Sequence, residues 1–252
     1  MQGVPGRPAP RGLQLKTDAT LFIRLHIFVQ LTKIARKCAI MTRRWAVVVS
    51  DVVRSSRRRD LRSMLGPRLR AVSAAHLRQK VIRLPYAVTA GDEFQTIAGD
   101  LSQLPGLIYD LRRRMRPLRL RIGIGIGTVH GRIRPPVNQL GGQAFEFARE
   151  AIEEAKSSHT HLEMRTRFRS DHEGFDALAN LIYCLHDALV GDPSEQQWAT
   201  IDAYLARKRV DLAANALKIS ASTASRNLKR SRFWYSLETI ETVSRLIRTT
   251  FS

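Results

Sequence analysis

The stretch Tyr86-Ala87-Val88-Thr89-Ala90-Gly91-Asp92-Glu93-Phe94-Gln95 decides the fold of this chain. Its first residues favour a strand, Gly91 permits a tight turn with positive φ, and Phe94 returns the chain to the core. Asp92 and Glu93 are therefore predicted at the tip of a β-hairpin. Acidic residues at such a turn are commonly ordinary polar turn residues, and we expect Glu93 to be solvated.

Two further strands give this hairpin its context. Trp45–Val53 is a buried-strand pattern that contains Asp51, and Leu120–Gly127 is a strand pattern with glycine at every second position. This order places Asp51 and Asp92 on neighbouring strands of one sheet. The alternating glycines either let a ligand approach the backbone closely or relieve crowding against a helix.

Helical periodicity separates and follows these strands. The pattern predicts a β-α-β-β-α-β, ferredoxin-like arrangement in an α+β domain over residues 42–190. An edge strand near Leu162–Phe168 and a helix over Gly174–Leu189 complete the domain, with Leu178, Leu181, Ile182, Leu185 and Leu189 of that helix facing the core. The expected elements of the repeat are helices Asp60–His76, Leu101–Met115 and Ala144–Ser157, and hairpin strands Val81–Val88 and Phe94–Ala98.

The remaining segments divide at composition changes. Residues 1–41 are rich in Gly, Pro and basic residues at their start, which indicates a disordered leader or an over-called extension before Met41. Gly191-Asp192-Pro193-Ser194 combines turn residues with a new helix start, so a second, all-helical domain is predicted over residues 191–252. Its helices are expected at Gln197–Ala206, Asp211–Leu217, Ser222–Arg230 and Leu237–Thr249.

The segment Asp211–Arg230 fits a helix-turn-helix with Ser220 or Ser222 capping the second helix. Its expected core consists of apolar residues from both helices and the turn: Leu212, Ala213, Leu217, Ile219, Ala224 and Leu228. Lys218 stands where such turns usually carry glycine. The alternative is a helical hairpin that packs on the first domain. Residue types suited to base edges or phosphates make DNA the predicted partner of the second helix, through Thr223, Ser225, Arg226, Asn227, Lys229 and Arg230.

The composition supports a soluble chain with a polyanionic partner. The net charge is +20 over 252 residues, although 34 of the 42 basic residues are Arg, which compositional bias alone would also produce. No apolar run of about 18 residues occurs, so no membrane span is expected. The two cysteines, Cys38 and Cys184, are far apart, which makes a disulfide framework improbable and fits a cytoplasmic location.

Four motifs in this order resemble the SatD family of bacterial proteins. They are Val48–Arg57, Gly91–Gln95, Arg121–Gly127 and Ala144–Ala151, followed by the Ser225–Arg230 stretch of the helix-turn-helix. The resemblance runs from about Thr42 to the C-terminus. The same layout is similar to class III nucleotide cyclases and, more distantly, to GGDEF diguanylate cyclases.

The cyclase resemblance implies a metal and nucleotide site. By that resemblance Asp51 and Asp92 would bind Mg²⁺, which prefers carboxylate and phosphate oxygens, and Gly91 and Arg149 would contact a nucleotide. The residues alone leave a second interpretation, in which Asp51 caps the next helix and Asp92 is a turn residue. Cyclases usually carry an Asn near the position of Arg149, and this chain does not. The basic run at residues 57–59 suits either a triphosphate or a solvated turn.

These observations favour a cytoplasmic DNA-binding transcriptional regulator. Its cyclase-like domain would bind a nucleotide ligand or form a homodimer, and its C-terminal helices would bind DNA. The alternative is an active, Mg²⁺-dependent nucleotidyl cyclase or another phosphoryl-transfer enzyme, so catalytic residues are left unassigned.

Overall fold

A computed structural model describes residues 43–55, 60–157 and 165–251 of the chain. The predicted leader and the basic run at 57–59 lie outside the described residues. Residues Arg43–Ser252 belong to one compact unit. None of the described helices combines the length and the apolar composition needed to cross a membrane.

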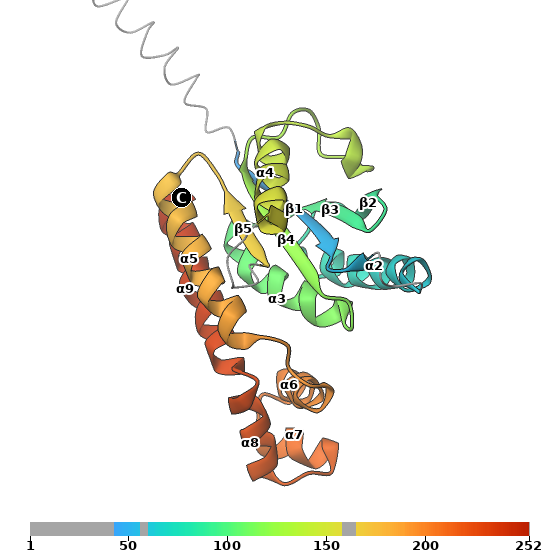
Figure 1. Ribbon diagram of the computed structural model, residues 1–252, viewed down its shortest axis with the longest axis vertical. Coiled ribbons are helices and arrows are strands. Elements are labelled where there is room, and N and C mark those ends of the chain that lie inside the picture. Colours follow the sequence, from blue (N-terminus) through green and yellow to red (C-terminus); the bar gives the residue numbers. More distant parts are fainter. Residues whose placement is uncertain (1–42, 56–59, 158–164, 252) are drawn as a thin grey trace, which may run out of the picture. The chain divides into compact units, whose positions relative to one another are not determined.

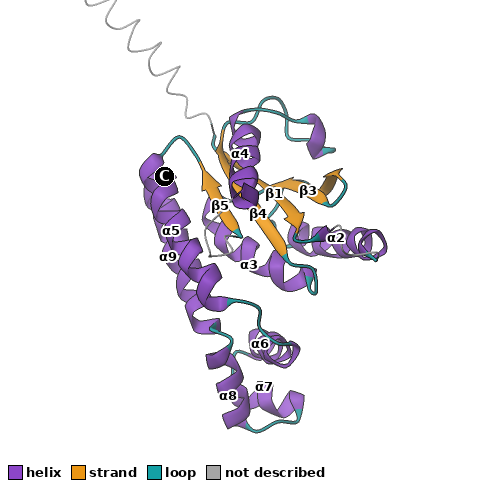
Figure 2. Ribbon diagram, viewed as in Figure 1, coloured by secondary structure: helices purple, strands orange, loops and turns teal. Residues whose placement is uncertain are grey.

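The centre of the fold is a five-stranded sheet with the order β2-β3-β1-β4-β5 (Figure 2). The first four strands pair antiparallel with their neighbours, and β5 runs parallel to β4. The predicted edge strand is present as β5, although residues 162–164 of its predicted range lie outside the described residues. Asp51 lies on β1, which pairs with β3, whereas Asp92 lies in the turn directly before β3 and not on a strand as predicted. The strands are β1 (Trp45–Val52), β2 (Ala87–Ala90), β3 (Glu93–Ile97), β4 (Leu120–Gly127) and β5 (Thr166–Arg169).

Helices cover both faces of this sheet. Val48 and Val52 of β1 belong to the large core beneath helices α2 and α3, whereas Val47 and Val49 pack in a second core against α4. This alternation explains why the strand is apolar at almost every position. The covering elements are α2 (Leu61–Arg78), η2 (Leu101–Gln103), α3 (Leu104–Met115), η3 (Val137–Gln139) and α4 (Gln143–Ser157).

The glycines of β4 allow α4 to lie directly on the sheet (Figure 1). A Cβ added at Gly123 would stand 2.5 Å from the backbone nitrogen of Ile152, and one at Gly125 would collide with the backbone at Ala144 and Ala148. Such close approach leaves no room for any side chain. Of the two interpretations of this strand, relief of crowding against a helix is the one observed.

Five helices complete the chain: α5 (Glu173–Val190), α6 (Glu195–Arg207), α7 (Val210–Leu217), α8 (Ala221–Arg230) and α9 (Phe233–Phe251). Helix α9 joins two cores. Phe233 at its start packs with Ile201 and Leu228 in a small helical core, and Val243 and Ile247 belong to the large core under the sheet. Figure 1 shows α9 running beside α5.

Three expectations were wrong in detail. Leu212, expected in the core of the helix-turn-helix, is 41% exposed. The first hairpin strand is shorter than predicted, because it begins at Ala87 and Ile82 makes only an isolated bridge to Ala98. Helix α5 presents a different face to the core, where Phe175, Ala179 and Tyr183 are buried. Of the five residues expected to face the core, only Ile182 packs against it. The four leucines are instead 52–59% exposed: Leu178, Leu181, Leu185 and Leu189.

Candidate functional site

Helices α7 and α8 are joined by the turn Lys218–Ser220. Lys218 adopts the left-handed conformation, with φ 54° and ψ 42°, and its N–H closes the last turn of α7. Ser220 caps α8, since its hydroxyl accepts a hydrogen bond from the Thr223 N–H at 3.1 Å. The cap predicted from sequence is therefore present, and a lysine occupies the backbone conformation that glycine usually supplies.

The outward face of α8 carries donors and cations. Ser225, Arg226, Lys229 and Arg230 are exposed, whereas Thr223 is half-buried. Asn227 differs from expectation, because its side-chain amide donates to Thr200 Oγ1 of α6 at 3.0 Å and it is half-buried. That contact holds α8 on α6. Four of the six predicted residues are exposed to solvent.

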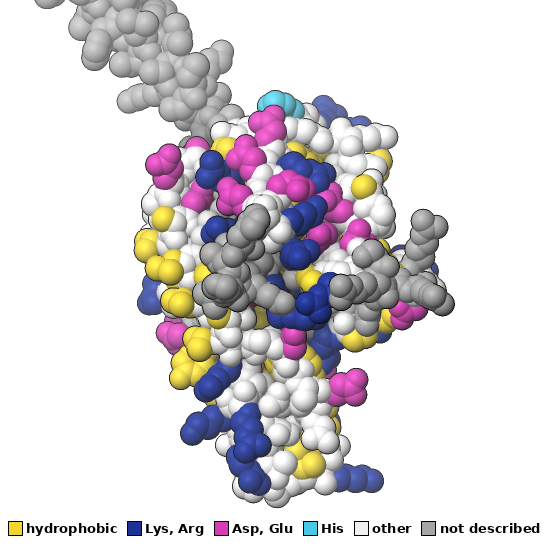
Figure 3. Space-filling view, in the orientation of Figure 1, with side chains coloured by type: hydrophobic (Ala, Val, Ile, Leu, Met, Phe, Trp, Pro, Cys, Tyr) yellow, Lys and Arg dark blue, Asp and Glu magenta, His cyan; other side chains and the backbone are white. Residues whose placement is uncertain are grey.

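Basic residues dominate this end of the chain. Residues 203–235 contain eight Lys and Arg, all exposed, against one acidic residue, Asp211. Asp211 is itself paired with Arg209, with a nitrogen–oxygen distance of 2.6 Å. Figure 3 shows dark blue side chains over the lower part of the molecule, where α8 lies in Figure 1, while acidic side chains gather at the opposite end.

A cluster of three carboxylates lies where β1 ends and the hairpin turns. Asp51 and Glu93 are buried at 8% and 6% exposure, and Asp92 is half-buried at the tip beside Gly91, whose φ is +58°. The Asp92 side chain accepts a hydrogen bond from the Val52 N–H at 3.3 Å. The predicted proximity of Asp51 and Asp92 is thus present. Asp51 lies within β1, so it does not cap α2.

Cations from α4 and β4 already face this cluster. Arg149 donates to Glu93 Oε2 at 2.8 Å, and Lys156 Nζ lies 3.4 Å from the same oxygen and 4.0 Å from Asp51 Oδ2. Arg121 Nη1 is 3.7 Å from Asp51 Oδ2. Glu93, expected to be solvated, is therefore a buried ion-pair partner. Glu93 begins β3, in which every residue is buried.

The pKa values of Asp51 and Glu93 shift in opposite directions in this environment. Burial raises the pKa of Asp51, and the attraction of Arg121 and Lys156 only partly offsets it. Burial also acts to raise the pKa of Glu93, but hydrogen bonds from Arg149 and Thr89 outweigh it and hold that pKa below its usual value. Asp51 Oδ1 and Ser50 Oγ are buried without a hydrogen-bond partner in the described residues.

The donor set fits a hard cation only in part. A carboxylate oxygen without a partner suits Mg²⁺, which commonly uses one or two protein carboxylates together with substrate phosphates. Within the described ranges, no group of three or more His, Cys, Asp or Glu side chains is arranged to hold a metal ion. Asp51 and Asp92 are the residues that would hold Mg²⁺, and its binding there stays a prediction.

Comparison with known proteins identifies the family. The model of the SatD family matches residues 45–247. The chain belongs to the SatD family. No curated protein matches this SatD-family chain.

One solved structure is similar over most of this SatD-family chain. It is a regulator of polyketide synthase expression from Bifidobacterium adolescentis, with 14% identity, a TM-score of 0.29, and coverage of 81% of this chain and 86% of that one. At that TM-score the similarity supports no conclusion about fold or function.

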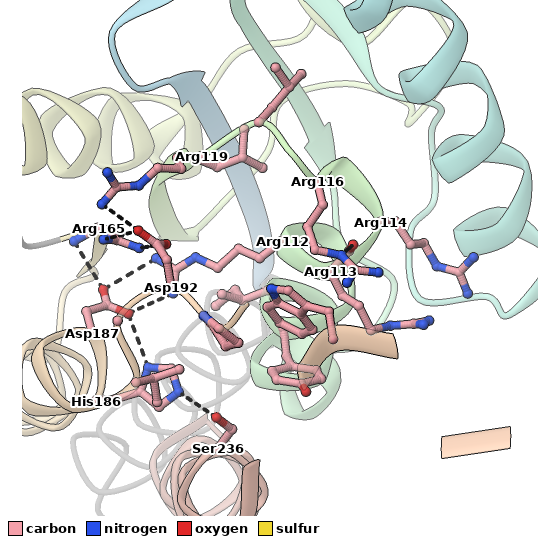
Figure 4. Close-up of a pocket in the computed structure, with 18 of the residues that line it drawn as sticks. Arg112, Arg113, Arg114, Arg116, Arg119, Arg165, His186, Asp187, Asp192 and Ser236 are labelled. Carbon is pink, nitrogen blue, oxygen red and sulfur yellow. Dashed lines mark hydrogen bonds and ion pairs between the residues drawn. The ribbon is translucent and has the colours of Figure 1, made fainter. Parts of the chain in front are cut away.

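This SatD-family chain also has a cavity of about 710 Å³ where α3, α5, α6 and α9 meet. Arginines line this cavity. Figure 4 shows several of them paired with Asp187 or Asp192. Arg112 pairs with Asp187 at 2.7 Å, and Arg113 and Arg116 bind Asp202 of α6 at 2.8 and 2.7 Å. The first pair joins α3 to α5, and the two pairs with Asp202 connect α6 to α3 and the residue that follows it.

An aromatic surface completes the cavity. The Arg116 guanidinium lies 4.6 Å from the centre of the Trp198 ring, and Tyr109 lies beside Trp198 with ring centres 6.3 Å apart. The Tyr109 hydroxyl and Arg112 Nε are buried without a hydrogen-bond partner in the part of the chain that is described. No single motif in the sequence marks this cavity, because its residues come from many separate segments of the chain. The nearest signal is the run Arg112–Arg116.

Proposed function

We propose that this SatD-family chain is a cytoplasmic DNA-binding transcriptional regulator. In this proposal α7 and α8 form a helix-turn-helix, and α8 enters the major groove as the recognition helix. The observation that carries the proposal is the outward face of α8, which offers Ser225, Arg226, Lys229 and Arg230 with no acidic residue between positions 212 and 237.

The residues of α8 would make two kinds of contact, one with bases and one with phosphates. Arg226 lies near the middle of the helix and its Nη2 is 3.4 Å from Thr223 Oγ1, which orients the guanidinium. A guanidinium suits the paired acceptors of guanine. Lys229 and Arg230 lie in the last turn, where they suit phosphates. Base contacts supply sequence preference, and phosphate contacts supply affinity for any DNA.

The test compares alanine variants on two kinds of DNA. A preferred site is selected from a random pool with the full chain, and binding is then measured by fluorescence anisotropy across a salt series. Arg226→Ala should weaken binding to the preferred site more than to random DNA, by roughly 1–3 kcal/mol of discrimination. Lys229→Ala should weaken both alike and reduce the salt slope by about one.

Bulk charge needs a matched control, because the chain carries +20. Arg78→Ala removes one exposed cation at the end of α2, far along the chain from α8. If Arg78→Ala lowers affinity as much as Arg226→Ala does, or if removing Arg226, Lys229 and Arg230 together leaves binding intact, then DNA binding by α8 is refuted.

We further propose that the sheet and its helices are a ferredoxin-like, cyclase-related palm. The order β2-β3-β1-β4 with all three pairings antiparallel supports this. The division into a domain over residues 42–190 and another over 191–252 stays a prediction, and the later half of α9 packs in the core under the sheet.

The cavity between α3, α5, α6 and α9 is the place we propose for a regulatory ligand. Arginine donors beside the Trp198 and Tyr109 rings suit a flat, anionic molecule of the nucleotide class. Because Asp202 on α6 is bound there by Arg113 and Arg116, such a ligand would alter the contacts of α6. A thermal-shift screen with nucleotides should show stabilisation that Trp198→Leu abolishes; no shift with any nucleotide would contradict the proposal.

The alternative function is a Mg²⁺-dependent nucleotidyl cyclase or related phosphoryl-transfer enzyme. The buried, unpartnered Asp51 Oδ1 near Asp92 favours it. Asp51 and Asp92 would hold the ion, which would neutralise phosphate charge, and Gly91 and Arg149 would contact the nucleotide. Incubation with Mg²⁺ or Mn²⁺ and each nucleoside triphosphate tests it. A cyclic product that Asp92→Ala abolishes would establish the enzyme and displace a purely regulatory role.

A further inference from the structure

After the exposed Glu173 in its first turn, the outward face of α5 is apolar. From Gly174 to Leu189 its fully exposed positions are Gly174, Ala177, Leu178, Leu181, Leu185, Ala188 and Leu189. In a chain where 25% of residues are charged, such a face is unusual. Figure 3 shows the hydrophobic side chains gathered along the left edge, where α5 lies in Figure 1. Contiguous exposed apolar surface of this kind marks an interaction site.

The opposite side of α5 already anchors the helix in the molecule. Phe175, Ala179 and Tyr183 pack in the large core, and Asp187 is paired with Arg112. The four exposed leucines therefore form a second apolar face of α5, which we call the leucine face. Their spacing of three, four and four residues is the spacing by which one helix packs against another.

The leucine face has a spacing that matches a second, antiparallel copy of itself. Leu181 and Leu185 are symmetric about position 183, and Leu178 and Leu189 are symmetric about a point half a residue beyond it. When two copies of α5 run antiparallel about a two-fold axis near residue 183, leucine meets leucine along the whole face. A two-fold interface requires this self-matching. We propose that a second copy of this chain covers the leucine face through an antiparallel α5–α5 pair.

The charge and the length of the leucine face both suit a second copy of this chain. The face spans 16 positions, which is about 24 Å of helix, and carries no charged side chain that would repel its copy in a chain of net charge +20. Gly174, Ala177 and Ala188 lie among the leucines and let the helix axes approach closely. The dimer would also carry two copies of α8, although the inference does not rest on DNA binding.

The first test measures mass in solution without DNA. Light scattering after size exclusion should give twice the 28.5 kDa chain mass for the full chain. Leu181→Glu combined with Leu185→Glu should give a monomer, with the dissociation constant raised at least about a hundredfold. Leu212→Glu is the matched control, because Leu212 on α7 is 41% exposed and lies outside the leucine face; it should remain a dimer.

A monomeric full chain at all concentrations would overturn the proposal, and would assign the leucine face to another occupant such as residues 1–42 or a different protein. A dimer that survives both glutamates would overturn it as well. Neither result bears on DNA binding by α8, so failure here is distinguishable from failure of the proposed function.

Cross-linking tests the pairing even if the glutamate variants do not fold. In a Cys38→Ser, Cys184→Ser background, Leu178→Cys and Leu189→Cys proteins are mixed and oxidised. Antiparallel pairing predicts disulfides between the two unlike variants and none within either variant alone, because two copies of position 178 would stand about 16 Å apart along the helices. Disulfides only between like variants would refute the antiparallel arrangement.

Discussion

Asp51 and Glu93 are neighbouring buried carboxylates whose neutral replacements should have opposite effects on stability. Glu93 accepts hydrogen bonds from Arg149 at 2.8 Å and Thr89 at 3.0 Å, and Lys156 lies 3.4 Å away. Asp51 receives only longer contacts, at 3.7 Å from Arg121 and 4.0 Å from Lys156. We therefore predict that Glu93→Gln destabilises the protein at pH 7 and Asp51→Asn does not.

The magnitudes follow from these contacts. A hydrogen bond to a charged group contributes about 1.5–3 kcal/mol, and Gln keeps the shape of Glu93 but loses its charge, so a cost of about 2 kcal/mol is expected for Glu93→Gln. For Asp51 the pKa is raised, chiefly by burial, which means that folding disfavours its charged form. Asp51→Asn should therefore leave the free energy of unfolding unchanged or raise it by up to about 1 kcal/mol.

The two pKa shifts determine how each contribution to stability changes with pH. The lowered pKa of Glu93 contributes stability above the ordinary glutamate pKa, and this contribution is lost as pH falls toward the folded-state pKa. The raised pKa of Asp51 costs stability at neutral pH, and this cost disappears as pH falls through the raised value. Both variants should therefore converge on the wild type in acid.

Urea unfolding followed by circular dichroism at pH 7 and near pH 4 measures both effects. Thr89→Val serves as a control, because it removes one donor to Glu93 and leaves every charge in place. Equal destabilisation by Asp51→Asn and Glu93→Gln at pH 7 would refute the argument, since it would show that burial does not dominate at Asp51. Adding Mg²⁺ extends the test, because stabilisation by the ion should require Asp51.

Three further predictions concern single positions. Gly125→Ala should destabilise the protein by at least about 1–3 kcal/mol in urea unfolding, because its Cβ would meet the α4 backbone; a neutral effect would show that α4 can move away. Lys218→Gly should raise the melting temperature, with a gain of up to about 1 kcal/mol, because φ is 54° there, and a lower melting temperature would count against the observed turn. Asp187→Asn should cost about 3–5 kcal/mol at pH 7, because it breaks a buried pair with Arg112. Since the pKa of Asp187 is lowered, that cost should shrink as pH falls below the ordinary aspartate value, and a pH-independent cost would contradict the ion-pair explanation.

The sequence by itself determined the elements and much of their order. Alternation of Ile and Gly over Leu120–Gly127 predicted a strand, and the turn residues around Gly91 predicted the hairpin with Asp92 at its tip. Both signals are local, because backbone sterics and side-chain period act over a few residues. The proximity of Asp51 and Asp92 followed from strand order.

Only the tertiary structure decided which side chains are covered. Helix α5 has two apolar faces, and periodicity reveals that such faces exist without revealing which one meets the core. Phe175 and Tyr183 pack against Phe168 of β5, and this aromatic contact turned the leucines outward. Glu93 was likewise placed by partners on α4, more than fifty positions away in the sequence, whose ion pairs make its burial possible. Contacts between distant segments depend on how elements pack, and no local pattern records that packing.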